Sequence, residues 1–513
     1  MFSLLLLRVP FKLKPFGDPL WFANKIDHTN PNDERTYQQR YYVNTQYTEG
    51  KDKSKTLIFY IGGESELDES SVTNGAVITL AQETKAVILG LEHRFFGESY
   101  PTEDLSLENL TYLTIHQAIE DLASFITEMK PIYCEDECKV AVVGGSYPGD
   151  LSAWFRMKHP ELADVSWASS APVLAKADFT EYDQHLAHVI RTYSEKCYTS
   201  LKETLDYVEE LTTGTNVTKM KKTMQIFGIR PELAFDNSSF LYMVSDILAT
   251  TVQYSSFLVY LKDLCSALEE APTLDDKVVT LANTTTAISS AMGMVFLLDY
   301  PLICDDPKVT SPYKDTRAWT WMTCNEVGYF QTASGELRAK SIDIEYYESI
   351  CQILFNKGLP DTDATNKEYG GLNPTGTKTI YVNGEFDPWS TLSIKENNTE
   401  LQRYSYIIDN GHHCDDLSYE GESDSESLKL IRTTVINTLL EWLGENTNQE
   451  PQDDDDDSIG GKVAISILGA LLGVAIIVII VLAVKLYKSK SNTHVSNSNE
   501  DQSKDDEPTG DQV

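Results

Sequence analysis

Positive charge is scarce in this chain of 513 residues. Lysine and arginine number 42 against 78 aspartates and glutamates, which gives a formal net charge of −36. A surface that binds nucleic acid needs a positive field to displace counterions from phosphates, so this composition excludes sequence-independent nucleic-acid binding. The sequence also lacks an internal repeat. It is nevertheless long enough to bury one large core or two smaller ones.

Charge is absent altogether from one stretch near the C-terminus. Residues 463–484 form an apolar run of 22 residues without the polar stripe of a soluble core helix, and this predicts a transmembrane helix. An acidic stalk, 445–462, precedes the run, and lysines open the tail, 485–513. This basic flank predicts a cytoplasmic tail. The protein is then a single-pass type I membrane protein with a lumenal or extracellular ectodomain, at the cell surface or in endosomes and lysosomes.

The N-terminus lacks the basic region that begins an ordinary signal peptide. Residues 1–20 contain one very short apolar run, which an atypical signal segment or an incomplete N-terminus would explain, and a tail-anchored cytosolic protein is the rival interpretation. All eight cysteines precede residue 463, which favours an oxidising compartment; Cys134 and Cys138 suit a local disulfide or free thiols better than zinc. Glycosylation acceptors in the same part of the chain are Asn109, Asn216, Asn237, Asn283 and Asn397.

Strand-like and helical segments alternate in the first half of the chain. Runs rich in β-branched residues at 56–61, 86–91 and 139–143 predict strands, and an amphipathic stretch at 114–130 predicts a helix before the third strand. This alternation predicts an α/β fold with a parallel sheet covered on both faces.

The pattern changes after a further predicted strand at 165–173. Helical periodicities dominate from about 180 to 303, strands resume at 378–382 and 404–408, and a closing helix is predicted at 426–443. A helical insertion therefore interrupts one α/β core. The predicted domains are the first core part, 21–177, the helical insertion, 178–345, and the second core part, 346–444.

The sharpest chemical signal lies where the third predicted strand runs into a helix. Residues 142–149 read VVGGSYPG. A nucleophilic serine has to project from a tight turn at the carboxyl end of a strand, and glycines relieve the crowding of that turn. Pro148 departs from Gly-x-Ser-x-Gly, but proline suits the first turn of a helix. Ser146 is therefore a candidate nucleophile, and a plain glycine-rich turn is the alternative.

A serine nucleophile needs a base and a carboxylate that orients the base. Asp387 follows the strand 378–382 and His413 follows the strand 404–408, which reproduces the order Ser, Asp, His of α/β-hydrolases. The alternative for Asp387 is a turn cap before proline. The alternative for the histidines is a metal cluster of His412, His413, Cys414, Asp415 and Asp416. Adjacent residues at a strand end do not easily converge on one ion, so neither a metal nor a cofactor is expected.

Further motifs resemble the family of prolyl carboxypeptidase, dipeptidyl peptidase II and thymus-specific serine protease. The matching stretches, in order between about Trp21 and Gly444, are DH at 27–28, QQRY at 38–41, YIGGE at 60–64, EHRFFGES at 92–99, GGSY at 144–147, AWFR at 153–156, ASSAPV at 168–173, CNEVGYFQ at 324–331 and NGEFDPW at 383–389. The resemblance implies an α/β-hydrolase core with an inserted helical cap domain, to which the sequence adds one C-terminal transmembrane helix.

By this resemblance the chain is a serine-type exopeptidase that hydrolyses short peptides at prolyl or alanyl bonds through an acyl-enzyme, as dipeptidyl peptidase or prolyl carboxypeptidase. Its triad is Ser146, Asp387 and His413, since the family's Gly-x-His pattern selects His413 over His412. An acyl-ester hydrolase and a catalytically silent receptor or adhesion protein are the alternatives. The intact residues in the expected order argue against the silent alternative.

The resemblance also implies roles for residues around the triad. Backbone N–H groups of Tyr147 and of Gly63 or its neighbour would meet the oxyanion. Trp389 would line the pocket for proline, with a place in the core as the alternative. Glu64 and Glu326 are candidates for binding a peptide α-amine, with a structural role as the alternative for either. The cap would exclude folded proteins from the site. Peptides are the expected partners, and a homodimer is left open.

Overall fold

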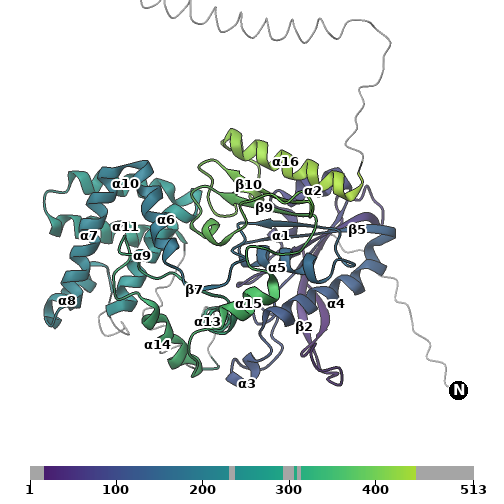
Figure 1. Cartoon of the computed structure of the whole chain (residues 1–513), viewed down its shortest axis with the longest axis horizontal. Helices are drawn as coiled ribbons and strands as arrows, with labels where there is room; N and C mark the ends of the chain where they lie inside the picture. Colours follow the sequence, from purple (N-terminus) through teal and green to yellow (C-terminus); the bar gives the residue numbers. More distant parts are fainter. Residues whose placement is uncertain (1–16, 230–236, 293–305, 309–312, 446–513) are drawn as a thin grey trace, which may run out of the picture. The chain divides into compact units, whose positions relative to one another are not determined.

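A mixed sheet of eight strands forms the centre of the fold (Figure 1). The computed structural model describes residues 17–229, 237–292, 306–308 and 313–445. The strands lie in the order β1-β2-β4-β3-β5-β6-β9-β10, and all neighbours from β4 to β10 are parallel. Their bounds are β1 Leu20–Lys25, β2 Thr36–Asn44, β3 Ser54–Ile61, β4 Val87–Leu91, β5 Cys134–Gly145, β6 Val165–Ser169, β9 Thr379–Gly384 and β10 Arg403–Ile408. This arrangement is the predicted α/β-hydrolase-like core.

The central strands are apolar on both faces because helices cover both. Every residue of β4, β6 and β9 is buried. One face packs against α4 (Ile115–Tyr133) and α5 (Tyr147–Lys158). The other face packs against α2 (Val77–Thr84) and α16 (Glu426–Leu443). Parallel sheets require such cover on both sides, and it leaves the carboxyl ends of the strands at one common edge.

The antiparallel strands β1 and β2 were not predicted from the sequence. β1 pairs with β2, which in turn pairs antiparallel with β4, with Tyr41 opposite Leu91. β2 carries polar residues that are buried all the same. Gln39 donates to the carbonyl of Glu92, and Arg40 pairs with the Glu92 carboxylate. These long-range partners satisfy the polar groups, so the strand needs no apolar run that a sequence pattern would reveal.

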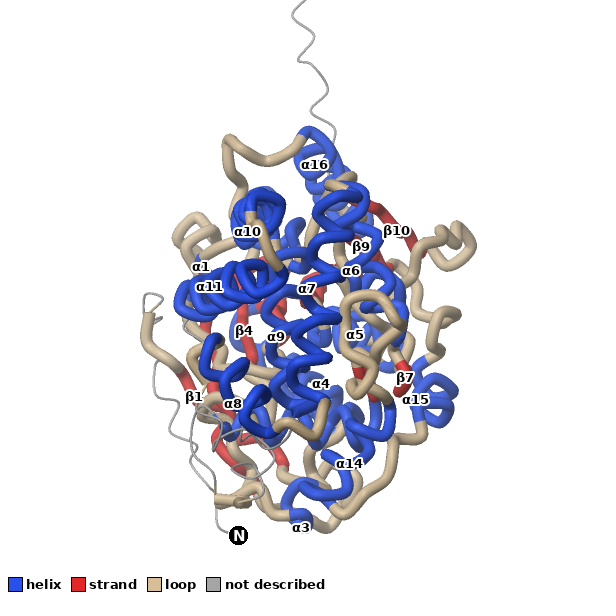
Figure 2. Tube along the Cα trace, turned by 90° about the vertical axis from the view of Figure 1, so that its left-hand side faces the viewer, coloured by secondary structure: helices blue, strands red, loops and turns tan. Residues whose placement is uncertain are grey.

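A layer of helices is inserted between β7 (Lys176–Asp178) and β8 (Gly328–Phe330) (Figure 2). These two short strands pair in parallel and bring the ends of the insertion together. Its helices are α6 Thr180–Tyr193, α7 Glu195–Thr213, α8 Val217–Ile226, α9 Asn237–Gln253, α10 Leu258–Glu270, α11 Leu274–Met292 and α13 Tyr313–Met322. Further α-helices of the described residues are α1 Ser70–Thr73, α3 Leu107–Leu110, α14 Ile344–Phe355 and α15 Thr362–Tyr369.

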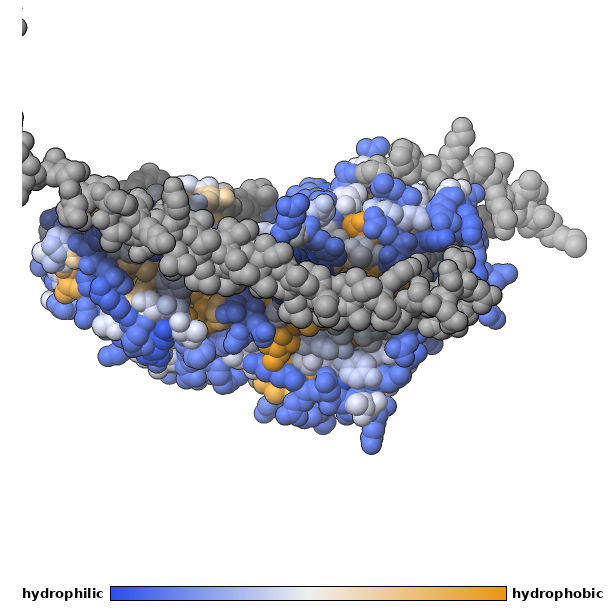
Figure 3. Space-filling model, turned by 90° about the horizontal axis from the view of Figure 1, so that it is seen from above, coloured by the Kyte–Doolittle hydropathy of each residue, from blue (hydrophilic) through white to orange (hydrophobic). Residues whose placement is uncertain are grey.

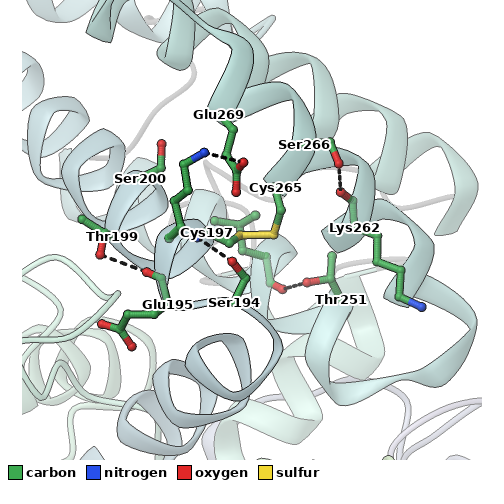
Figure 4. Close-up of a disulfide and its surroundings, with 12 residues drawn as sticks. Ser194, Glu195, Cys197, Thr199, Ser200, Thr251, Lys262, Cys265, Ser266 and Glu269 are labelled. Carbon is green, nitrogen blue, oxygen red and sulfur yellow. Dashed lines mark hydrogen bonds and ion pairs between the residues drawn. A yellow bond between two sulfur atoms is a disulfide. The ribbon is translucent and has the colours of Figure 1, made fainter.

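Three disulfides among the described residues confirm the prediction of an oxidised chain. They are Cys134–Cys138, Cys197–Cys265 and Cys324–Cys351. The second joins α7 to α10 (Figure 4), and the first closes the part of β5 where its register with β3 shifts. Cys414 is a free thiol, and Cys304 lies outside the described residues. Of the predicted glycosylation acceptors, Asn216, Asn283 and Asn397 are exposed, and Asn109 and Asn237 are half-buried.

The membrane prediction needs correction. Across residues 17–229, 237–292, 306–308 and 313–445, no helix is both long enough and apolar enough to cross a bilayer. The 19-residue helices α4, α7 and α11 all carry charged residues, and the face seen in Figure 3 is mainly hydrophilic. The segment 463–484 lies outside the described residues. The structure therefore does not bear out the predicted transmembrane helix or the predicted single-pass membrane protein.

Candidate active site

Ser146 stands at the sharp turn between β5 and α5. Its backbone has φ 63° and ψ −135°, a conformation that costs a residue with a side chain on the order of 1–3 kcal/mol. Its N–H donates to the carbonyl of Ser169 at 2.9 Å, and its own carbonyl accepts from the N–H of Gly149 at 2.8 Å. These contacts hold the strained turn at the carboxyl edge of the sheet.

The neighbours of Ser146 explain why this turn needs glycine and accepts proline. A Cβ atom on Gly144 would lie 2.1 Å from the carbonyl oxygen of Pro148, so no side chain fits there. Pro148 occupies the first turn of α5, where its missing N–H breaks no intrahelical bond. Its ring lies against Gly63 in the loop after β3. The approach is so close that a Cβ atom placed on Gly63 would be 2.5 Å from Pro148 Cγ. The departure from Gly-x-Ser-x-Gly therefore fits the turn.

Asp387 and His413 form a buried hydrogen-bonded pair. The distance between His413 Nδ1 and Asp387 Oδ2 is 2.9 Å. Asp387 is fully buried, and its other carboxylate oxygen accepts the backbone N–H of Trp389 at 3.0 Å. Burial lowers the pKa of His413, but the Asp387 carboxylate outweighs burial and raises it well above the ordinary value. The pair can therefore hold a proton on the imidazole.

The loop that carries His413 lies beside the turn that carries Ser146. A Cβ atom on Gly145 would be 2.9 Å from Cys414 Sγ, and the N–H of Cys414 donates to Ser170 Oγ at 2.9 Å. The strands β5, β6, β9 and β10 are consecutive neighbours, so their carboxyl ends meet at one edge. The fold brings the three residues of the predicted triad to this edge.

The side chains of the 412–416 segment have separate partners. His412 Nδ1 is 2.6 Å from the carbonyl oxygen of Val252, whereas His413 contacts Asp387. Asp416 accepts the indole N–H of Trp167 at 2.8 Å. Within the described ranges, no three His, Cys, Asp or Glu side chains are arranged to hold a metal ion. This segment is therefore a hydrogen-bonded loop rather than a set of converging ligands.

A family model described as serine carboxypeptidase S28 matches residues 24–435. The chain belongs to this family. A probable serine protease EDA2 of Arabidopsis thaliana is 32% identical over 83% of this chain and 88% of its own. The thymus-specific serine protease of Mus musculus is 29% identical over 82% and 87%, and the lysosomal Pro-X carboxypeptidase of Homo sapiens is 27% identical over 83% and 88%. The resemblance found in the motifs is confirmed, and this S28 protein is a serine peptidase.

An aromatic wall stands next to the Asp387–His413 pair of this S28 peptidase. Trp389 follows Asp387 by two residues, and its ring centre lies 6.4 Å from that of His413. Tyr182 and Tyr329 pack edge-on against Trp389 at 5.5 and 5.6 Å. The insertion supplies Tyr182 through α6, so the cap and the core build this wall together.

The predicted oxyanion donors flank the Ser146 turn. Tyr147 is the residue after Ser146, and Gly63 lies against Pro148 from the loop after β3. The Tyr147 side chain is buried, and its hydroxyl lies 3.1 Å from His93 Nε2. Burial lowers the pKa of His93 to about 4, so this imidazole is neutral at pH 7. His93 therefore supports Tyr147 as a neutral hydrogen-bond partner.

The two glutamates predicted to bind an α-amine have different surroundings. Burial raises the pKa of Glu64, while the charge of His413 acts in the opposite direction, so Glu64 lies within electrostatic range of the triad. Glu326 lies in a π-helical turn, Thr323–Val327, and its Oε2 accepts the N–H of Ile115 at 3.0 Å. Burial raises the pKa of Glu326 to about 7. One oxygen of Glu326 is thus engaged by the start of α4.

Gln253, the last residue of α9, was missed by sequence reasoning. Its carbonyl accepts the N–H of His413 at 2.9 Å. Its side-chain Oε1 accepts the indole N–H of Trp389 at 3.1 Å and the hydroxyl of Tyr182 at 2.7 Å. It lies far from His413 in sequence and belongs to no motif, so no local signal would have found it.

Asp150 was also missed, although a signal existed. It is fully buried in the first turn of α5, four residues after Ser146, and its N–H donates to the Ser146 carbonyl at 3.1 Å. An acidic residue one helical turn from a candidate nucleophile is itself such a signal, because that spacing puts it near the reacting groups.

Proposed function

We propose that this S28 peptidase is an exopeptidase that hydrolyses short peptides at prolyl or alanyl bonds. Ser146 is the nucleophile, His413 is the general base and Asp387 orients the base. The observation that best supports this assignment is the buried Asp387–His413 hydrogen bond beside the strained Ser146 turn. A serine held in such a turn, next to a histidine whose other nitrogen is bound to a carboxylate, matches the requirements of acyl transfer.

In the mechanism, His413 Nε2 accepts the Ser146 hydroxyl proton while Oγ attacks the substrate carbonyl carbon. The proton then passes from His413 to the leaving amine as the peptide bond breaks. Water repeats the sequence on the acyl-enzyme and releases the acid. Asp387 accepts the Nδ1 hydrogen bond throughout and stabilises the charged imidazolium, in agreement with the raised pKa of His413.

Two backbone N–H groups would stabilise the oxyanion that forms in each step. We assign them to Tyr147 and Gly63, or the residue after Gly63. Support comes from the contact between Gly63 and Pro148, which holds the loop after β3 against the start of α5. Removing one such donor typically costs about 100- to 1000-fold in rate.

The aromatic wall supports the preference for proline. A flat indole such as Trp389 packs well against a pyrrolidine ring, and Tyr182 and Tyr329 hold it edge-on. We further propose that the inserted segment, 178–345, covers the site and restricts it to short peptides. In support, α9 contacts the His413 loop through Gln253, and His185 of α6 contacts the carbonyl of Glu385 at 3.0 Å.

Product analysis by mass spectrometry tests the proposal. Peptides with a single proline near either end are incubated with the full-length protein between about pH 4 and 8, with simple esters in parallel. The position of cleavage distinguishes a dipeptidyl peptidase from a carboxypeptidase. Ser146→Ala is the control and should lose about 10⁶ in rate while staying folded. Hydrolysis of esters without trimming of any peptide would refute the exopeptidase and favour an esterase.

A further inference from the structure

One oxygen of Asp150 has no hydrogen-bond partner in the part of the chain that the structure describes. Asp150 Oδ2 lies 3.1 Å from the hydroxyl of Tyr329. Oδ1 is buried, and no donor among the described residues reaches it. An unpaired buried oxygen normally costs a protein stability, so its retention beside Ser146 points to a group that binds there.

The hydrogen bonds of Tyr329 decide where the proton of this carboxyl group lies. The Tyr329 hydroxyl is within reach of both the Pro172 carbonyl oxygen and Asp150 Oδ2, but it has only one proton to donate. A carbonyl cannot donate, and Pro172 is the nearer partner, so it receives that proton. Asp150 must then donate to Tyr329 from Oδ2. Burial raises the pKa of Asp150 well above its ordinary value, in agreement with this neutral form.

The free Oδ1 belongs to a carboxyl group that lies among the reacting residues. Burial has the largest effect on the pKa of Asp150. Two charges act on it as well: that of Glu64 raises this pKa, and that of His413 lowers it. Glu64 follows β3 and Ser146 follows β5, and these strands are parallel neighbours. Tyr329 connects Asp150 to the aromatic wall at Trp389. The two carboxyl groups therefore flank the same edge of the sheet as the triad.

We propose that Asp150, together with Glu64, binds an alkylammonium group of the peptide substrate next to the scissile bond. This inference rests on the proposed function and specifies its substrate class. An ammonium group carries three N–H donors, so one of them gives Oδ1 its missing hydrogen bond. When it binds, the Asp150 proton leaves to solvent and the carboxylate pairs with the incoming charge.

A cation fits the site better than a neutral donor. A neutral hydroxyl or amide would give Oδ1 one hydrogen bond, whereas an ammonium group also gains the charge of the ionised Asp150 carboxylate, with Glu64 close enough to add to it. Among the described residues, neither Asp150 nor Glu64 forms an ion pair with lysine or arginine. Buried acids are stable as ions only when a cation is close. Two parts of a peptide supply such a group, the N-terminal α-amine and the side chain of a lysine that directly precedes the prolyl residue.

Binding to the full-length Ser146→Ala protein separates this inference from catalysis. Four peptides of one sequence, each with proline before the scissile bond, combine a free or acetylated N-terminus with lysine or norleucine directly before that proline, and calorimetry gives each Kd. We expect the peptide with the relevant cation to bind about 10- to 100-fold more tightly than its neutral match. The acetylation arm reports on the α-amine, and the norleucine arm reports on the side chain.

Adding Asp150→Asn should reduce the ratio of the two Kd values to about 1, because the new side-chain amide still donates to Tyr329 but the paired charge is gone. Glu66→Gln is the matched control. Glu66 is an exposed carboxylate two residues after Glu64, and its loss should leave the ratio unchanged. Equal binding of cationic and neutral peptides in both arms, or a ratio that survives Asp150→Asn, would overturn the inference.

A second measurement decides the case if Asp150→Asn does not fold. Calorimetry of the Ser146→Ala protein in two buffers of different ionisation enthalpy counts the protons released on binding. The cationic peptide should release about one more proton than its neutral match, because Asp150 ionises. No difference in proton release would also overturn the inference. Wild-type protein that cleaves no peptide would refute the proposed function alone, since the Kd ratio stands without turnover.

Discussion

Replacing Gln253 by alanine should loosen the connection between the inserted helices and the catalytic loops. The substitution removes the acceptor of two hydrogen bonds, from Tyr182 and from Trp389. Tyr182 is only 1% exposed, so its hydroxyl would be left without water. An unpaired buried hydroxyl costs about 1–3 kcal/mol and the half-buried indole about 1 kcal/mol, which gives about 2–4 kcal/mol in total.

The rate should fall as well, although Gln253 takes no part in proton transfer. Trp389 donates its backbone N–H to Asp387, so a shift of its ring displaces the carboxylate that orients His413. Small displacements of this kind cost up to about 100-fold, and we expect kcat to fall about 10- to 100-fold with little change in KM. The backbone hydrogen bond from His413 to the Gln253 carbonyl is unaffected by the substitution.

Thermal unfolding and steady-state kinetics on the same preparations measure both effects. Gln253→Glu keeps an oxygen acceptor for Tyr182 and Trp389, so it should restore most of the stability and of kcat. Its negative charge should raise the pKa of His413 further and move the acid limb of the rate profile to higher pH. Gln225→Ala, an exposed glutamine of α8, is the control. An alanine variant within twofold of wild type in kcat, or a glutamate variant as impaired as alanine, would refute this reasoning.

Three further predictions concern the triad, the turn and the cap. Asp387→Asn removes the charge that raises the pKa of His413, so the acid limb of the pH profile of kcat should move to lower pH. The maximum of kcat should fall about 10⁴-fold. An acid limb that does not move would contradict the role assigned to Asp387. Gly144→Ala should abolish fluorophosphonate labelling and lower the unfolding temperature, because its Cβ would meet Pro148, whereas Gly214→Ala, in open space, should be neutral. Loss of the Cys197–Cys265 disulfide should destabilise the cap by about 2–4 kcal/mol in calorimetry, and an unchanged transition would contradict this.

The residues that sequence reasoning located share one property: their role depends on their immediate neighbours. Ser146 was found because a strand-to-helix turn needs glycine beside the serine, and the 2.1 Å approach at Gly144 is the reason. The closing helix was predicted over 426–443 because its apolar periodicity is local, and α16 has these bounds. The triad order along the chain pointed to Asp387 and His413, which the structure joins at 2.9 Å.

The features that escaped prediction depend on contacts between distant segments. β2 buries Gln39 and Arg40 against Glu92, so its polar sequence resembles an exposed loop. Gln253 acts on His413 only because the insertion folds back over the sheet. The buried carboxyl group of Asp150 contacts the hydroxyl of Tyr329, which lies 179 positions along the chain. No window of sequence contains both partners of such a contact.

The spacing between the two catalytic loops depends on β6, which supplies none of the triad. Ser169, its last residue, accepts the N–H of Ser146 through its carbonyl and donates its hydroxyl to Asp416. The next residue, Ser170, accepts the N–H of Cys414. Both loops are therefore bound to the end of one buried strand, at its last residue and at the residue that follows it. A rigid strand beside both loops fixes where Ser146 and His413 lie, which allows a strained turn and a long loop to hold one geometry before substrate arrives.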